Sequence, residues 1–286
     1  MRLPNQTRVR AVVTVILLCC CPLCFGTALV VLISGNAIVF GADGLNQTTL
    51  GNNSTPIPNG TATKVLILDS RFIISSTGVG STRSYVFADL VKSLPVKSSS
   101  SVRGVAQMLS AKCWPIFLKL WPSLSLVPSN LANDHSLPLV TYFVGGYEFR
   151  GPELYSVKIF IDWKTHRLRQ PAVAKEYPMS PELIKQLMTK GPIYHNIIPM
   201  HAGRKGGGME WLTTDGSVLQ QKYLRLYPKE MGALIRDEVL DVDSLTRLGK
   251  IMLAGEIEVS PGDFSFPVTV CSVALRKRAT CQTFDH

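Results

Sequence analysis

Cysteine is scarce over most of this 286-residue chain, and this scarcity excludes two kinds of architecture. Four of the seven cysteines lie in the first 24 residues, which leaves Cys113, Cys271 and Cys281 for the rest. Three cysteines allow at most one intramolecular bridge, so a small domain built on several disulfides is excluded. The sequence leaves open whether any two of them pair, and the apolar run around Cys271 favours a small core residue. Their spacing matches no zinc-binding pattern, and we expect no metal site.

Histidine is also rare, and the five histidines are scattered along the chain. No Ser-His-Asp grouping and no His-x-x-x-His spacing is present, which argues against a histidine-based hydrolase and a helical metal site. The glycine-rich segment 201–208, HAGRKGGG, lacks the spacing of a phosphate-binding loop and the Ser or Thr that follows one. We interpret it as a flexible surface loop and expect no cofactor.

Dense basic runs are absent, although the formal net charge is +10. The nearest candidate is the segment 274–280, ALRKRAT, which contains no aromatic residue. A nucleic-acid interface needs basic residues interleaved with aromatics, so we expect no nucleic-acid partner and interpret this segment as a solvated strand end. With 46% hydrophobic residues, the chain is long and apolar enough for one large domain with a substantial core.

Residues 1–26 have the three parts of a secretory signal peptide. A basic start without acids is followed by an apolar run, with the small residues that signal peptidases prefer at Cys24 and Gly26. The apolar run is shorter than the roughly 20 residues that span a bilayer. The sequence therefore predicts cleavage between Gly26 and Thr27, a mature domain of residues 27–286 and a secreted or periplasmic location. An uncleaved anchor is the alternative, and only this anchor would attach the chain to a membrane.

Apolar, β-prone runs predict strands at residues 27–34, 37–43, 64–78, 137–163 and 266–275. Turn-forming pairs divide or separate them at Gly35-Asn36, Asp69-Ser70 and Gly145-Gly146. The polar segment 44–63 is expected to be a loop.

Helical spacing of apolar residues predicts helices at 81–94, 100–124, 180–190 and 230–260. Ser81 is the expected cap of the first, and Pro115 and Pro122 are expected to bend or end the second. Strands followed by helices, then strands, helices and a strand, are typical of an α+β fold with antiparallel sheets and segregated helices.

Cleavage after Gly26 would give Thr27 a free α-amine beside its hydroxyl. The pKa of an α-amine is about 8, so the amine is able to accept the hydroxyl proton while the oxygen attacks a carbonyl. Asp43 ends the second predicted strand, and Lys64 opens the third. Because an antiparallel pair brings the start of one strand near the end of the next, we expect Lys64 between Asp43 and Thr27. Gly78, before the first predicted helix, lets backbone N–H groups turn toward an oxyanion.

Several motifs occur in a specific order along the chain. They are GTALVVLISGNAIVFGADG from Gly26, Lys64 at the head of a strand, STGVGS from Ser76, VGGYEFRGPELYSV from Val144 and SFPVTVCSVAL from Ser265. Together they resemble the β-subunits of proteasomes, which are N-terminal nucleophile hydrolases. The resemblance covers residues 26–94 and 138–161 and, loosely, 230–275. The order and spacing of the motifs, rather than any single one, make the resemblance specific.

The resemblance implies a four-layer αββα sandwich of two antiparallel sheets flanked by helices. It also implies that Thr27 is the nucleophile, that Asp43 and Lys64 are its polar support, and that the Gly78 backbone donates to the oxyanion. The chain departs from the family at Gly44-Leu45, where the family usually has Ser-Arg. No counterpart of the later Asp and Ser that support the family's threonine is found.

The sequence thus predicts a secreted threonine-type hydrolase that cleaves peptide or smaller amide bonds through an acyl-enzyme. The predicted partner is the peptide or amide substrate, and a homo-oligomer is left open because the family forms rings. The alternative is a catalytically inactive secreted binding or structural protein with the same sandwich fold. The lack of counterparts to the family's later Asp and Ser favours this alternative.

Overall fold

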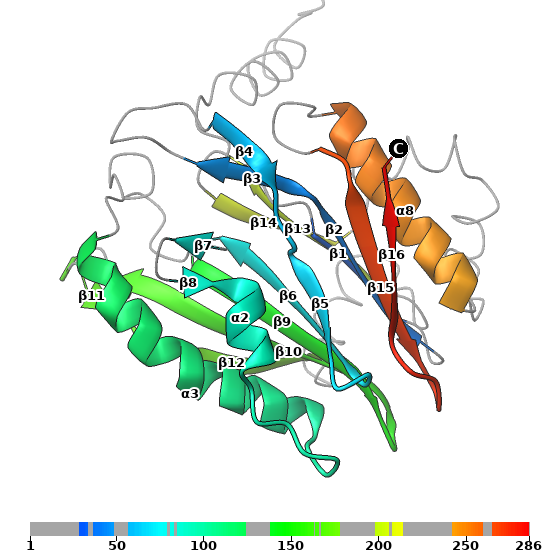
Figure 1. Cartoon of the computed structure of the whole chain (residues 1–286), viewed down its shortest axis with the longest axis horizontal. Coiled ribbons are helices and arrows are strands. Elements are labelled where there is room, and N and C mark those ends of the chain that lie inside the picture. The colour runs from blue at the N-terminus through cyan, green and yellow to red at the C-terminus, as the bar shows by residue number, and fades with distance from the viewer. Residues whose placement is uncertain are drawn as a thin grey trace, which may run out of the picture.

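The computed structural model describes residues 29–33, 37–48, 57–78, 81–82, 85–123, 138–162, 164–165, 167–177, 198–205, 208–213, 242–259 and 265–285. Within these ranges the chain has a mixed α+β fold with two antiparallel sheets (Figure 1). The α+β class and the antiparallel pairing expected from the sequence are confirmed. The predicted signal peptide, 1–26, and the predicted helix at 180–190 lie outside the described residues.

The first sheet has the strand order β14-β13-β1-β2-β15-β16. Its strands are β1 (Leu29–Ile33), β2 (Ala37–Asp43), β13 (Ile198–Lys205), β14 (Gly208–Thr213), β15 (Val268–Ala274) and β16 (Thr280–Phe284). β1 pairs with β2 so that Leu29 is opposite Ala42, which confirms strands within the predicted ranges 27–34 and 37–43. The turn predicted at Gly35-Asn36 lies outside the described residues. β2 is therefore bordered by a strand from each end of the chain, β1 and β15.

The second sheet has the strand order β11-β10-β9-β6-β5, and β12 also pairs with β10. Its strands are β5 (Val65–Leu68), β6 (Phe72–Gly78), β9 (Pro138–Glu148), β10 (Gly151–Asp162), β11 (Arg167–Leu168) and β12 (Ala172–Tyr177). β5 and β6 form the hairpin predicted at 64–78. Asp69 and Ser70 make its turn with positive φ angles of 52° and 54°, as expected for the tip.

The described helical segments are α2 (Phe87–Lys92), α3 (Val102–Leu120), α8 (Val242–Val259) and the short 3₁₀ turn η1 (Trp121–Ser123). α3 begins after Ser101, whose side chain accepts a hydrogen bond from the Gly104 N–H, and continues through Pro115. α8 lies inside the predicted range 230–260. Among the helices that the structure describes, none has the length and apolar character needed to cross a membrane.

The pair Gly145-Gly146 does not divide two strands as predicted, because both glycines lie inside β9. A Cβ at the first glycine would lie 2.4 Å from the Phe40 ring of the first sheet. A Cβ at the second would lie 2.9 Å from the Val102 side chain of α3. The glycines therefore allow other elements to approach β9 closely, and the turn to β10 follows at residues 149–150.

Ser81 does not cap a helix at 81–94. It pairs with Val86 in a short hairpin of β7 (Ser81–Thr82) and β8 (Tyr85–Val86), and α2 begins only at Phe87. The backbone of Val86 is extended, and the Tyr85 side chain before it is buried. Packing of this tyrosine in the core outweighs the local capping preference.

Two segments predicted as loops contain paired strands. The polar segment 44–63 includes β3 (Leu45–Thr48) and β4 (Ile57–Thr61), which pair with each other. The segment 201–208 is not a flexible loop, because most of it belongs to β13 and the start of β14. β13 pairs with β1 as well, so long-range backbone pairing places residues 201–205 in the first sheet.

Three apolar clusters place the helices relative to the sheets. One lies between the two sheets and includes Phe40 and Phe143. A second packs α2 and α3 against the second sheet and includes Leu109, and a third packs α8 against the first sheet and includes Leu248. The two sheets therefore face each other, and the helices cover their outer faces (Figure 1).

Cys271 and Cys281 form a disulfide bond between β15 and β16. Cys271 is buried in the core, as the apolar run around it indicated, and the bridge answers the question of pairing that the sequence left open. The strand register places the two cysteines directly opposite each other, and β16 was not predicted from its largely exposed residues. Cys113 is buried and free.

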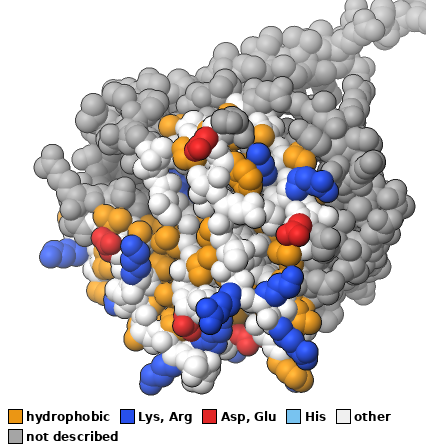
Figure 2. All heavy atoms as spheres, turned by 45° about the vertical axis from the view of Figure 1, so that its right-hand side comes forward, with side chains coloured by type: hydrophobic (Ala, Val, Ile, Leu, Met, Phe, Trp, Pro, Cys, Tyr) orange, Lys and Arg blue, Asp and Glu red, His pale blue; other side chains and the backbone are white. Residues whose placement is uncertain are grey.

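The turn between β15 and β16 is basic and exposed. Residues 275–278 are exposed, which confirms the solvated strand end expected in this segment. The Ala279 N–H donates to the Ser70 carbonyl at 2.8 Å and joins this turn to the tip of the β5–β6 hairpin. On the face drawn in Figure 2, Lys and Arg side chains are more frequent than Asp and Glu, and apolar and uncharged groups separate them.

The disulfide bond is expected to stabilise the fold measurably. In the variant Cys271→Ala/Cys281→Ser, the free energy of unfolding should fall by about 2–3 kcal/mol, because the unfolded chain loses a closed loop. Denaturant unfolding with and without a reductant measures the effect. The reductant should destabilise the native chain and leave the double variant unchanged, and an equal response of both proteins would contradict the bridge.

Candidate functional site

A buried ion pair joins Lys64 to Asp43. The Lys64 Nζ lies 2.9 Å from Asp43 Oδ1, and the two side chains are 10% and 0% exposed. Asp43 is the last residue of β2, and Lys64 immediately precedes β5. The contact therefore connects a strand of the first sheet to a strand of the second.

Backbone contacts hold Asp43 in place. The Leu45 N–H donates to Asp43 Oδ2 at 3.1 Å, so both carboxylate oxygens accept a hydrogen bond. The Gly44 N–H donates to the Ser265 carbonyl at 3.1 Å, and the Gly44 carbonyl accepts from the Ala62 N–H at 2.9 Å. The turn after β2 is thus tied both to the segment before β15 and to the segment before Lys64.

Glycine is required at position 44 because the backbone of Pro267 lies very close to it, a contact that the sequence does not reveal. A Cβ at this position would lie 2.4 Å from the Pro267 carbonyl oxygen. The departure from the Ser of the resembled family therefore has a structural reason. No local pattern could have identified it, because the contacting residue is far away along the chain.

The environment of Lys64 opposes its charge. Burial lowers the pKa of Lys64, and the carboxylate of Asp43 partly opposes this shift. An ammonium group carries three N–H donors. In the described part of the chain only the Asp43 carboxylate accepts from it, so the other donors are available to a further group. A buried lysine with a lowered pKa and free donors is typical of functional sites. A perturbed pKa alone also occurs in structural ion pairs.

Gly78 lies at the end of β6, on the strand that neighbours Lys64. The Ser76 N–H donates to the Lys64 carbonyl at 3.1 Å, and Gly78 follows two residues later. Its φ angle is 89°, and a Cβ would lie 2.4 Å from the Leu139 carbonyl oxygen. Both the backbone angle and the lack of space require glycine here.

The structure brings together part of the predicted site. Asp43 and Lys64 are in contact, and Gly78 is close to Lys64 along the neighbouring strand. Thr27 lies outside the described residues. Leu29, the first residue of β1, pairs with the residue that precedes Asp43, so β1 begins at the end of β2 that carries the ion pair.

Comparisons with known proteins provide no family assignment. No protein-family model matches the chain, and no curated protein matches it. Within the described ranges, no group of three or more His, Cys, Asp or Glu side chains is arranged to hold a metal ion. What the geometry offers chemically is a buried ammonium group that one carboxylate fixes in place.

The ion pair should behave as a coupled unit in unfolding experiments. Lys64→Met should lower the free energy of unfolding by about 3–5 kcal/mol, because it leaves the Asp43 carboxylate buried without a counterion. Asp43→Asn/Lys64→Met should recover most of this loss, since the amide oxygen still accepts from the Leu45 N–H. Urea unfolding at neutral pH measures both variants, and equal losses in the single and the double variant would contradict the coupling.

Gly78→Ala is expected to destabilise the fold through both strain and contact. A non-glycine residue at such a φ angle costs about 1–3 kcal/mol, and the Leu139 carbonyl adds a steric clash. Gly151→Ala is the matched control, because Gly151 has a φ of 122° but nothing within 4 Å of an added Cβ. Thermal unfolding should show the larger loss for Gly78→Ala, and equal losses would rule out the close contact with Leu139.

Proposed function

We propose that this chain is a secreted or periplasmic threonine-type N-terminal nucleophile hydrolase that cleaves peptide or smaller amide bonds. The observation that supports it best is the buried ion pair of Lys64 and Asp43. The pair lies at the end of β2, and the neighbouring strand β1 begins at that same end. The nucleophile in this proposal is Thr27. Because Thr27 precedes Leu29 by two residues, at most about 7 Å of chain separates their Cα atoms.

The arrangement of the layers supports the same proposal. Helix α8, the first sheet, the second sheet and helices α2 and α3 follow one another in space. This order is what the resemblance to proteasome β-subunits implies for a four-layer αββα sandwich. In the proposal the described elements are the core of such a hydrolase domain, residues 27–286.

Export supplies the free amine that the chemistry needs. In the proposal a signal peptidase cuts between Gly26 and Thr27, so the secretory machinery makes the threonine terminal. The disulfide bond between Cys271 and Cys281 supports a location outside the cytosol, because such bonds persist in oxidising compartments.

Acylation begins with proton transfer within one residue. The α-amine of Thr27 takes the proton of its own hydroxyl while Oγ forms a bond to the substrate carbonyl carbon. The carbonyl oxygen becomes an oxyanion, and the Gly78 backbone N–H is its proposed donor. When the intermediate collapses, the C–N bond breaks, the leaving amine receives the proton from the α-ammonium, and an ester on Thr27 remains.

Deacylation repeats the same proton transfers with water. The α-amine takes a proton from a water molecule, whose oxygen attacks the ester carbonyl. The C–O bond to Thr27 then breaks, its oxygen recovers the proton, and a carboxylic acid leaves. The enzyme returns to its starting state without a cofactor.

Lys64 and Asp43 have separate tasks in this mechanism. The Lys64 ammonium, with its free donors, lowers the pKa of the nearby α-amine through charge repulsion and so keeps it able to accept a proton. Asp43 fixes the ammonium in place and compensates its burial. Neither residue exchanges a proton with the substrate.

The mature N-terminus is the first test of this function. N-terminal sequencing and intact-mass measurement of the exported protein should identify Thr27 as the first residue. Thr27→Ala should abolish hydrolysis of a panel of fluorogenic peptide amides, and Thr27→Ser should retain part of it. Any other first residue, or full activity of Thr27→Ala, would contradict the proposal.

The double variant Asp43→Asn/Lys64→Met separates chemistry from stability. It is expected to fold but to lose at least about tenfold in kcat/KM, because the ammonium that acts on the α-amine is gone. A secreted binding or structural protein on the same sandwich is the rival proposal. It would be favoured by an exported chain that begins at Thr27, stays folded and cleaves none of the amides.

A further inference from the structure

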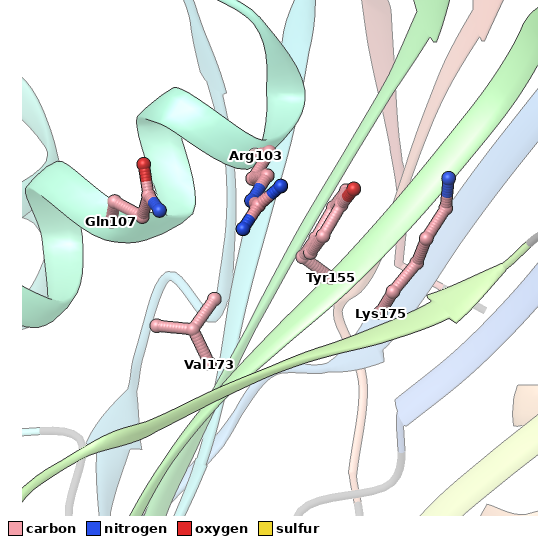
Figure 3. A pocket seen from close by; sticks show the side chains of 5 residues that line it. All are labelled: Arg103, Gln107, Tyr155, Val173 and Lys175. Carbon is pink, nitrogen blue, oxygen red and sulfur yellow. The ribbon is translucent and has the colours of Figure 1, made fainter.

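A small cavity lies on the outer face of the second sheet, where α3 covers β10 and β12. Its volume is about 240 Å³, and it is lined by Arg103, Gln107, Tyr155, Val173 and Lys175. Figure 3 shows Arg103 and Gln107 projecting from the helix and the other three side chains from the two strands. Tyr155 belongs to the apolar cluster under α3, whereas Lys64 contacts the first sheet, so this cavity is separate from the ion pair.

The cavity carries more positive than negative charge. Lys175 donates to Glu153 at 2.9 Å, and its Nζ lies 5.7 Å from the centre of the Tyr155 ring. The Arg103 guanidinium has no hydrogen bond or ion pair in the described part of the chain, and Figure 3 shows it directed toward the strands. Glu153 therefore pairs with one of the two cations, and the arginine keeps its planar set of donors open.

The position of Arg103 also conflicts with helix electrostatics. It is the second residue of α3, where the positive end of the helix dipole disfavours a cation, and the first turn contains no acidic residue. Ser101 and Glu148 already accept hydrogen bonds from N–H groups of this turn. A cation that gains nothing from its own helix is the kind of local conflict that functional sites show.

We propose that this cavity binds a small anion that presents one carboxylate or phosphate group. The Arg103 guanidinium pairs with the anionic group, Lys175 adds a second positive charge, and the Gln107 amide donates a further hydrogen bond. Val173, which is 37% exposed, and the Tyr155 ring contact the apolar part of the ligand. The cavity is smaller than the 300–1,000 Å³ of typical drug-sized sites, so it suits a small ligand.

Calorimetric titration of the exported, mature protein tests the proposal. The probes are inorganic phosphate and benzoate, each at constant ionic strength, because screening by salt would otherwise mimic competition. Arg103→Gln should weaken binding of at least one probe by about 10- to 100-fold, and Arg103→Lys should weaken it less because the charge remains. Lys119→Gln is the matched control, since it removes an exposed cation from the other end of the same helix.

The unfolding temperature distinguishes binding from a structural role. Arg103→Gln should leave Tm unchanged or raise it, because it removes a cation from the positive end of α3. Binding of phosphate alone or of benzoate alone supports the site and identifies the group it prefers. The proposal is overturned if neither probe binds at millimolar concentration, or if Arg103→Gln and Lys119→Gln bind as tightly as the native chain.

Discussion

The contact between Lys64 and Asp43 is the constraint on which the arrangement of the two sheets depends. Apolar side chains between sheets tolerate small shifts, because the hydrophobic effect has no direction. Two buried charges do not, since each is unfavourable without the other. The pair therefore fixes the end of β2 against the start of β5 to within hydrogen-bond distance. The turn at Gly44, the segment around Ser265 and the start of β1 all lie around this point.

Much of this arrangement could be predicted from local patterns. β1, β2 and the β5–β6 hairpin are continuous apolar runs with turn residues between them, and α3 has helical periodicity. Antiparallel pairing of β1 with β2 explains why β1 begins beside Asp43, whereas the contact with Lys64 joins two different sheets. Thr27 is part of the same prediction, but it lies outside the described residues.

The failures of prediction have a common physical cause, which is that distant partners decide the structure. The pair Gly145-Gly146 resembles a turn, yet Phe40 and Val102 need the space that the absent side chains leave. β16 consists largely of exposed residues. It forms because it pairs with β15 and is linked to it by the disulfide bond. The cavity at Arg103 joins residues from three elements, so no stretch of sequence reveals it.

The position of β2 has a consequence for the order in which the molecule can be completed. One of its two neighbours, β1, is close to it in sequence, whereas the other, β15, lies far along the chain. Pairing between such distant segments is slow to form, because a long loop must close first. Asp43 therefore reaches its final surroundings only after β15 has been synthesised and has paired with β2. A chain that stops before β15 would lack one border of the strand that carries this carboxylate.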